Sequence, residues 1–564
     1  MRPEATLATF LIPLAVVCVS GLALGEGVKP VRIILPPNGG PLVQKAAEVF
    51  GRQVGSRCDA CVMATGDAPV KVELAVEPGL GQGGFRIADG PSGTVRVVGN
   101  DEHGVLYGVG KLLRTSRYGP GGFSPGSWRG TSVPVCPVRG IYFATHFCNF
   151  YEAAPIEEVQ RYLEDLSLWG VNTLMLCFPT WQFEGFDDPV SQRAIARLKQ
   201  ISRAAKAAGV KVGMGKGNEG FRRTPKELLR TPVPDPMGRH GSFGVNLCPS
   251  EPAGHRMLLE DWGRVLDAFG DVGLDYVIYW PYDEGGCGCK DCWPWGSRGY
   301  PKLCRDFSQL ARAKSPKTQF IVSTWTFDTP PEGEWEGLTR FMAEDKSWAD
   351  YVMADAHEDY PRYPLEKGVP GGLPLLNFPE ISMWGQSPWG GYGANPFPHR
   401  LQRLWDQTQR KLSGGTPYSE GTYEDLNAVI CSQFYWDPAR PAAETVKEYI
   451  AFEYSPDVIG DVAAAIEIFE QNHLRNRIGP HAARAHELIQ TAEQKLTPQT
   501  RRTWRWRVLA LRALIDAEML KHQGRLEGQA LKEAFAELTT LYHAENAHSM
   551  PIRPPQVRTP ESKQ

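Results

Sequence analysis

The sequence predicts an α/β protein built around a closed (β/α)8 TIM barrel, with a small α/β domain before it and a helical region after it. A length of 564 residues allows two or three domains. Between residues 138 and 440, short apolar runs alternate with helical stretches, as the strand–helix repeats of a barrel require. Before this region the runs are short and β-rich, and after it amphipathic helical spacing continues without interruption.

Residues 1–25 have the pattern of a secretory signal peptide. Arg2 opens a short n-region, residues 7–19 are apolar, and small residues end the segment at Gly25. The apolar run is short for a membrane span, and Pro13 interrupts it. We therefore expect export to the periplasm or the extracellular space and no membrane span in the mature chain; a retained N-terminal anchor is the alternative.

Residues 26–127 are expected to form the small α/β domain. Gly, Pro and Asp turn signals separate its β-rich runs, and two stretches have helical spacing. The strand candidates are 31–37, 70–76, 83–90 and 93–99, and the helix candidates are 41–55 and 100–114. The Gly-, Pro- and Ser-rich segment 117–134 is typical of a linker or a rim loop.

Residues 138–440 supply the expected catalytic barrel. Eight short runs between turn signals and helical stretches are the strand candidates: 138–147, 171–179, 210–215, 274–281, 318–325, 350–357, 373–380 and 414–421. A doubly wound open sheet is the alternative. Such a sheet normally carries a glycine-rich nucleotide loop after its first strand, and the sequence has none there, which favours the barrel.

Residues 441–548 are predicted to be helical. Amphipathic spacing occurs in four stretches: 461–474, 482–496, 502–522 and 529–543. We expect these helices to pack on the barrel or on a partner subunit. Residues 549–564 are Pro-rich and charged and are expected to be disordered.

The charge balance argues against a nucleic-acid partner. The chain has 61 Lys and Arg against 64 Asp and Glu, a net charge of −3, and it has no polybasic arm. Its 16 tryptophans include several at expected strand ends and loops, where an exposed indole can stack on a sugar ring.

Catalytic groups of a barrel belong at the carboxyl ends of its strands. Acids and aromatic rings are concentrated there, at Trp181, Glu184, Asp283, Glu284, Trp325, Asp328, Asp355, His357, Glu358, Asp359, Glu380, Trp384, Tyr418, Glu420 and Tyr423. Hydrolysis of a glycosidic bond uses such groups: an acid that protonates the leaving oxygen, anions that stabilise an oxocarbenium-like state, and aromatic platforms. We therefore expect a glycoside hydrolase with an oligosaccharide or glycoconjugate substrate.

Two stretches carry a family resemblance. Residues 85–114 resemble the small domain that precedes the barrel in family-20 β-N-acetylhexosaminidases and in family-67 α-glucuronidases. In the barrel, "VRGIYF" resembles the Arg-Gly start of the family-20 barrel, and Asp283-Glu284 resembles that family's Asp-Glu pair. The resemblance implies that Glu284 is the general acid/base, that Asp283 orients an acetamido group and that Arg139 holds sugar hydroxyls.

The same resemblance implies removal of a terminal N-acetylhexosamine by substrate-assisted retention. Trp325 would match a pocket-wall tryptophan and Glu420 a hydroxyl-binding glutamate, while Tyr418 stands where that family usually has Trp. The glycines of this motif follow the acidic pair here, whereas in the family they precede it. His146 and Trp384 are further candidates for substrate contact.

Two alternatives remain open. By resemblance to family 67, Glu284, Asp355 and Glu380 could serve an inverting hydrolase, which needs a base about 6.5–9.5 Å from the acid. Adjacent residues such as Asp283 and Glu284 suit two tasks on one sugar better than an acid and a base on opposite faces, which favours the acetamido mechanism. The second alternative is a catalytically silent carbohydrate-binding protein on the same scaffold.

A cysteine cluster follows the acidic pair. Cys287, Cys289 and Cys292 are closely spaced, and Cys304 lies further along the chain, so four thiolates could hold a structural zinc ion. Disulfides are the favoured reading for an exported protein. In either form the cluster would pin the loop beyond Glu284, and neither a catalytic metal nor another cofactor is expected.

Overall fold

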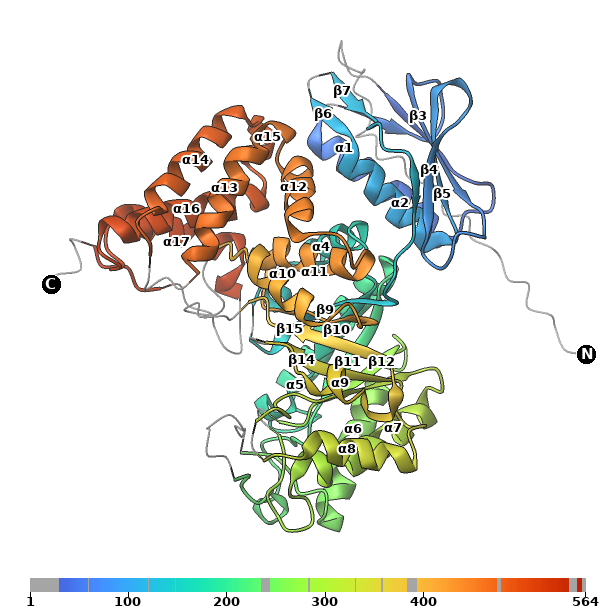
Figure 1. Ribbon diagram of the computed structural model, residues 1–564, viewed down its shortest axis with the longest axis vertical. Coiled ribbons are helices and arrows are strands. Elements are labelled where there is room, and N and C mark those ends of the chain that lie inside the picture. The colour runs from blue at the N-terminus through green and yellow to red at the C-terminus, as the bar shows by residue number, and fades with distance from the viewer. Residues whose placement is uncertain are drawn as a thin grey trace, which may run out of the picture. The chain divides into compact units, whose positions relative to one another are not determined.

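The structure is a computed structural model that describes residues 30–58, 60–119, 121–147, 149–234, 244–282, 285–329, 331–356, 359–382, 393–473, 478–546 and 555–559. The predicted signal peptide lies outside these residues, as does the predicted disordered tail apart from residues 555–559. The chain divides into two compact units, residues 1–132 and 133–564 (Figure 1).

The first unit contains a six-stranded mixed sheet in the order β2-β1-β3-β5-β4-β8. The strands are β1 (Val31–Ile34), β2 (Val62–Met63), β3 (Val70–Val76), β4 (Phe85–Asp89), β5 (Thr94–Gly99) and β8 (Gly130–Ser132). Strands β2, β1, β3 and β5 run parallel to one another, and β4 pairs antiparallel with both β5 and the edge strand β8. A separate hairpin pairs β6 (Arg117–Gly119) with β7 (Gly122–Ser124).

Two helices, α1 (Pro41–Arg57) and α2 (Glu102–Thr115), pack together in this unit (Figure 1). Asp101 caps α2 by accepting a hydrogen bond from the Gly104 N–H, which satisfies one donor that the first turn leaves open. Val105, Val109 and Leu112 are buried at helical spacing, as the sequence pattern predicted.

The second unit contains the predicted parallel barrel, which confirms the fold class. Its strands are β9 (Val138–Phe143), β10 (Thr173–Cys177), β11 (Lys211–Lys216), β12 (Tyr276–Tyr279), β13 (Gln319–Ser323), β14 (Tyr351–Ala356), β15 (Leu375–Pro379), and an eighth strand in two pieces, β16 (Gly414–Gly415) and β17 (Tyr418–Ser419). Each strand pairs in parallel with the next, and β9 pairs with both β10 and the eighth strand, so the sheet closes.

The closure of the barrel depends on a close approach at Gly414. Its φ of +128° lies in a region that favours glycine, and a Cβ atom there would lie 1.7 Å from the Val138 carbonyl oxygen. The glycine-rich start of the eighth strand therefore lets β16 pair with β9.

Helices follow the barrel strands, as the alternating pattern predicted. They are α4 (Ile156–Leu168), α5 (Pro189–Ala207), α6 (Pro252–Ala268), α7 (Gly299–Lys314), α8 (Glu334–Glu344), α10 (Pro398–Gln407) and α11 (Asp425–Trp436), with short α3 (Phe150–Ala153) and α9 (Tyr363–Glu366). Every residue of α11 is buried, and this helix contacts β9 on one side and α12 on another. Within the described ranges, no helix is long and apolar enough to span a bilayer.

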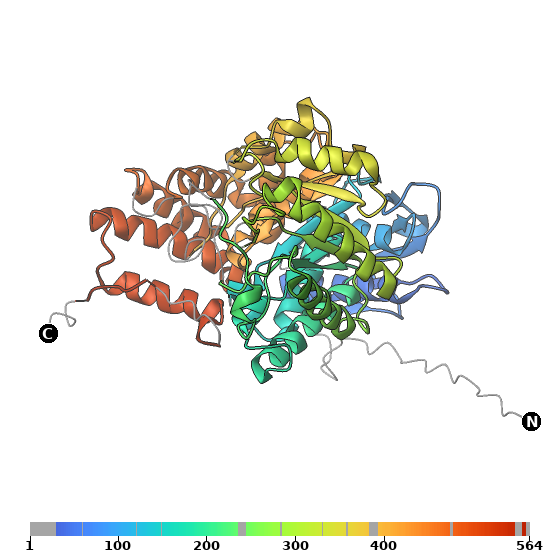
Figure 2. The same ribbon diagram turned by 90° about the horizontal axis from the view of Figure 1, so that it is seen from below.

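The C-terminal part of the second unit is helical, and its helices lie side by side in both views (Figures 1 and 2). They are α12 (Ala442–Glu453), α13 (Ile459–Gln471), α14 (Ala482–Lys495), α15 (Pro498–Arg501), α16 (Trp504–Lys521) and α17 (Gln529–Leu541). Arg505 of α16 bonds Asp425 at 2.7 Å and Asp165 at 3.1 Å, which ties these helices to barrel helices α11 and α4.

Candidate active site

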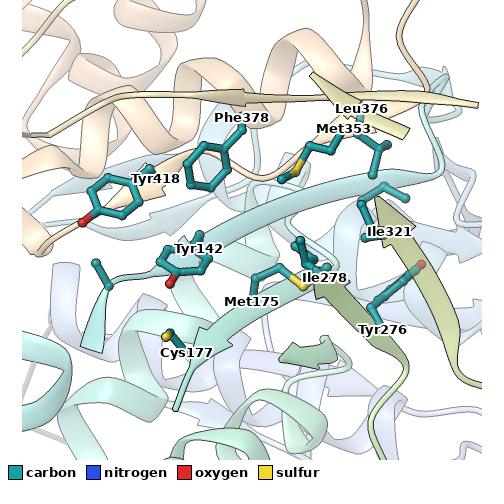
Figure 3. Close-up of a cluster of buried hydrophobic side chains, with 12 residues drawn as sticks. Tyr142, Met175, Cys177, Tyr276, Ile278, Ile321, Met353, Leu376, Phe378 and Tyr418 are labelled. Atoms are coloured by element: carbon teal, nitrogen blue, oxygen red, sulfur yellow. The ribbon is translucent and has the colours of Figure 1, made fainter. Parts of the chain in front are cut away.

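Aromatic side chains converge inside the barrel at the carboxyl ends of its strands. The Tyr142 ring stacks on Tyr418 with centroids 5.4 Å apart, and Phe378 lies 5.7 Å from each of these two rings. Figure 3 shows these three side chains gathered at one end of the buried cluster. Trp280 and Trp325 pack against the cluster and are only partly buried, so part of each indole remains accessible.

His146 lies just beyond β9, beside this cluster. Its ring is 6.2 Å from Tyr142, 6.0 Å from Trp181 and 6.5 Å from Tyr418. Burial lowers the pKa of His146 to about 4, because a charged imidazolium would lose hydration there. The imidazole is therefore neutral at physiological pH and can contribute a hydrogen-bonding group but no positive charge.

Three glutamates meet where β15 and the eighth strand end. Glu380 forms an isolated bridge with Tyr418, and its Oε1 accepts hydrogen bonds from the Ser382 N–H at 2.8 Å and the Ser382 hydroxyl at 2.7 Å. Glu420 is fully buried; its Oε1 accepts from the Tyr418 hydroxyl at 3.3 Å, and its Oε2 has no hydrogen-bond partner among the described residues. Glu424 accepts from the Ser419 hydroxyl and the Glu420 N–H.

Burial, followed by repulsion from Glu380, raises the pKa of Glu420 well above its usual 4.5. Burial, followed by repulsion from Glu420, likewise raises the pKa of Glu424 well above its usual value. A protonated Glu420 carries an O–H donor, so this carboxyl can both donate to and accept from a ligand hydroxyl.

The raised pKa of Glu420 should make the free energy of unfolding depend on pH. The folded state keeps the proton above the usual pKa of 4.5, whereas the unfolded chain loses it, so this residue's contribution to stability falls as pH rises above that value. For this one group, the free energy of unfolding falls by at most about 1.4 kcal/mol per pH unit. Glu420→Gln removes the titrating carboxyl group. We therefore expect the unfolding free energy of the variant minus that of the wild type, measured by urea unfolding, to be larger at pH 8 than at pH 5.

Glu184→Gln is the matched control, because it makes the same change of side chain at an exposed position on the loop after β10. A Glu420→Gln variant whose difference from the wild type is the same at both pH values would show that Glu420 is ionised in the folded protein.

Asp283 and Glu284 follow β12 and lie outside the described residues, but the chain on both sides of them is fixed. Before the pair, the Pro281 carbonyl accepts from the Trp295 indole at 2.6 Å. After it, the Asn218 amide accepts from the Gly286 N–H at 2.8 Å and donates to the Gly286 carbonyl at 3.1 Å. Arg230 donates to the Gly285 carbonyl at 2.7 Å.

Arg139 occupies a different place from the other candidates. It is the second residue of β9, and its guanidinium donates to the carbonyls of Gly170 at 2.7 Å and Cys136 at 2.9 Å. The guanidinium also lies over the Trp436 ring of α11, 5.2 Å from the centroid. Residues of the opposite parity, such as Tyr142, face the barrel interior, so Arg139 points toward the helical layer.

The structure gives the positions of some of the other candidate residues. Trp325 belongs to the aromatic cluster at the barrel end, together with Tyr418. Asp355 is the fifth residue of β14, where its backbone pairs with Phe378. Trp384 lies outside the described residues. The structure therefore brings together His146, Trp325, Glu380, Tyr418 and Glu420 at one end of the barrel and separates Arg139 from them.

Three further residues at this end of the barrel were not singled out from the sequence. Tyr142 and Trp280 belong to the aromatic cluster, and the place of Trp280 three residues before Asp283 was a usable signal. Lys216 ends β11 and is buried, with its ammonium 4.0 Å from the Glu219 carboxylate and bonded to the Glu219 carbonyl. A lysine after a short apolar strand carries no sequence signal that separates a buried cation from a surface one.

The cysteines differ from the expectation. The disulfides favoured from the sequence for this cluster are absent among the described residues, where Cys287, Cys289, Cys292 and Cys304 are free thiols. Cys304 is buried on α7 and does not belong to the thiol cluster. Its expected place is taken by Cys248, whose sulfur lies with those of Cys287, Cys289 and Cys292, all within 4.8 Å of one another.

Comparison with known proteins identifies the fold. No family profile and no curated protein matches the sequence. Several solved structures are similar to it. A family-115 4-O-methyl-α-glucuronidase with specificity for decorated arabinogalactans has 12% identity and a TM-score of 0.58, and the match covers 93% of this chain and 78% of that one. A family-138 enzyme targeting pectin rhamnogalacturonan II has 10% identity and a TM-score of 0.54, with 92% of this chain and 94% of that one covered, and a family-20 β-N-acetylglucosaminidase has 14% identity and a TM-score of 0.50, with 76% of this chain and 92% of that one covered. This chain therefore has the architecture of glycoside hydrolases.

Proposed function

We propose that this protein is a glycoside hydrolase that removes a terminal N-acetylhexosamine from an oligosaccharide or glycoconjugate by substrate-assisted retention. Glu284 is the general acid/base, and Asp283 orients the substrate's acetamido group. One observation carries the proposal. In the chain the pair comes four residues after β12, the fourth barrel strand, and barrel enzymes hold their catalytic groups beyond the carboxyl ends of their strands; hydrogen bonds at Pro281 and Gly286 hold the neighbouring residues on either side.

In this mechanism the acetamido oxygen attacks the anomeric carbon while Glu284 gives its proton to the departing glycosidic oxygen. Asp283 accepts a hydrogen bond from the acetamido N–H, which stabilises the positive charge that develops on the amide. Water then opens the cyclic intermediate as Glu284 takes back a proton. Two displacements at the same carbon leave its configuration unchanged.

The barrel end offers contacts for the sugar. Trp280 and Trp325 provide partly exposed aromatic faces for a sugar ring. Glu420, whose second oxygen lacks a partner among the described residues, can hydrogen-bond a sugar hydroxyl. His146, Asp355, Glu380, Trp384 and Tyr418 are further proposed contacts. Arg139 is not included, because its guanidinium is occupied by two carbonyl groups and the Trp436 ring.

An inverting α-glucuronidase-like reaction is the second candidate, and the position of Glu380 favours it. Glu380 follows β15, three strands from β12 around the barrel, and Asp355 lies on the neighbouring β14. A carboxylate on that side could activate water opposite a proton donor at Glu284. In this reaction Glu284 and either Asp355 or Glu380 would act on opposite faces of the sugar.

A panel of nitrophenyl glycosides tests the proposal. We expect turnover of an N-acetylhexosaminide, inhibition by a thiazoline analogue of the cyclic intermediate, and a first product with the substrate's anomeric configuration by ¹H NMR. Turnover of an α-glucuronide with inverted configuration would replace the proposal by the second candidate. Sugar binding without turnover of any substrate would identify a silent binding protein.

A further inference from the structure

The strongest feature outside the proposed catalytic groups is the cluster of four thiols. Cys287, Cys289 and Cys292 belong to the loop after β12, and Cys248 comes from the segment before α6. Each offers one sulfur, and the four sulfurs lie within 4.8 Å of one another. Two separate parts of the chain therefore bring four soft ligands to one point.

The spacing of the sulfurs fits a metal ion better than a disulfide. The Cys248 and Cys289 sulfurs are 3.7 Å apart, whereas a disulfide bond is about 2.05 Å long. Four thiolates around zinc, with Zn–S bonds of about 2.3 Å, form a tetrahedron whose edges measure about 3.8 Å. The observed separation is close to that edge.

The surroundings suit a closed thiolate site. Cys287 and Cys292 are fully buried, while Cys248 and Cys289 are partly buried. The Ser250 hydroxyl lies 3.0 Å from the Cys292 sulfur and can donate to it as a thiolate. A zinc ion with four thiolates carries a net charge of −2, and the Arg230 guanidinium beside Gly285 and Gly286 supplies a nearby positive charge.

We propose that Cys248, Cys287, Cys289 and Cys292 bind one structural zinc ion. Four protein ligands complete a tetrahedral shell and leave no position for water or substrate, which distinguishes the site from a catalytic zinc. Binding replaces the remaining thiol protons with the metal, so zinc uptake releases protons without any redox change. The ion joins the loop after β12 to the segment before α6.

The position of this site gives it a second consequence, which rests on the proposed function. Cys287 lies three residues after Glu284, and Gly285 and Gly286 between them are already held by Asn218 and Arg230. A zinc ion at Cys287 would restrict the loop at the next residue. It would therefore act as a positioning element for the proton donor rather than as part of the chemistry.

Metal analysis of the purified full-length protein, prepared without chelators, tests the site. We expect about one zinc ion per wild-type chain, the stoichiometry of a four-cysteine site. Cys248→Ser should lose at least nine-tenths of it. Cys304→Ser is the matched control, because it also removes a buried thiol from this part of the barrel but should keep the full zinc content.

The opposite pattern, with zinc lost from Cys304→Ser and kept in Cys248→Ser, would overturn the ligand assignment. A zinc-free wild type with four reduced thiols, or with a disulfide within the cluster by mass spectrometry of the unreduced protein, would overturn the proposal itself. Neither readout depends on activity. Zinc without glycoside turnover would contradict only the proposed function, and turnover without zinc would contradict only the metal site.

Cobalt substitution covers the case in which Cys248→Ser does not fold. Wild-type protein stripped with a chelator and reloaded with Co²⁺ should show the intense visible absorption of tetrahedral thiolate-bound cobalt, and Zn²⁺ should displace it. If the reloaded wild type shows nothing but the weak absorption of octahedral cobalt, this result would count against a four-thiolate site.

Discussion

Glu284→Gln is expected to lower kcat by about 10³-fold on the best substrate of the panel, within the usual range for loss of a general acid/base. Glutamine keeps the size and much of the hydrogen bonding of the side chain but has no acidic proton to donate and no carboxylate to accept one. KM should change little, because the proton transfer stabilises the transition state rather than the bound substrate. Steady-state kinetics on purified wild type and variant measure both constants.

The size of the loss should depend on the leaving group. Nitrophenolate departs readily without protonation, whereas a sugar alkoxide needs the proton, so the defect should be larger on a disaccharide than on a nitrophenyl glycoside. Asp291→Asn is the matched control, since it neutralises an exposed carboxylate in the same loop and should retain wild-type kcat. A Glu284→Gln variant that hydrolyses both substrates within a few-fold of wild type would refute the assignment.

Arg512→Ala is expected to have the largest effect on stability, lowering the free energy of unfolding by about 3–5 kcal/mol, as for other broken buried ion pairs. Arg512 and Asp516 form a fully buried pair at 2.8 Å on α16. The guanidinium also donates to the carbonyls of Ala394 at 2.7 Å, Asn472 at 2.6 Å and Phe469 at 3.3 Å. The substitution leaves a buried carboxylate without this cation and three carbonyls without this donor.

Urea unfolding followed by circular dichroism measures the change. Arg484→Ala provides the comparison, because Arg484 and Glu487 form an exposed pair on α14 at 3.0 Å, which should be worth less than about 1 kcal/mol. Equal midpoint shifts for Arg512→Ala and Arg484→Ala would show that the buried pair adds no net stability.

Arg512 also links the C-terminal helices to the site. Ala394, which accepts from Arg512, precedes Asn395, and the Asn395 amide donates to the Ser382 carbonyl at 3.1 Å. Ser382 in turn holds the Glu380 carboxylate. The helical region therefore supports the segment that carries one of the proposed contacts.

The barrel was predictable because each strand is a short apolar run that alternates with a helix, and this pattern depends only on nearby residues. The eighth strand was also among the strand candidates, although the structure divides it at Thr416 and Pro417. The strand ends then followed from strand order, which is why the acidic pair after β12 could be singled out.

The direction of a side chain was less predictable. All six residues of β9 are buried, so the strand shows no alternation of polar and apolar residues from which to tell the barrel interior from the helical layer. Arg139 was assigned to the interior from its place on the first barrel strand and by resemblance. The structure turns it toward Trp436, on an element almost 300 residues further along the chain.

The sequence by itself determined the architecture, the place of Asp283 and Glu284 after the fourth barrel strand, and the presence of closely spaced thiols in the same loop. Only the tertiary structure decided which residues share a site: it turned Arg139 outward, buried Glu420 beside Tyr418, and brought Cys248 to Cys289 across 41 positions of the chain. The physical reason is that strands and helices arise from local periodicity, whereas contacts between distant segments depend on how the barrel closes.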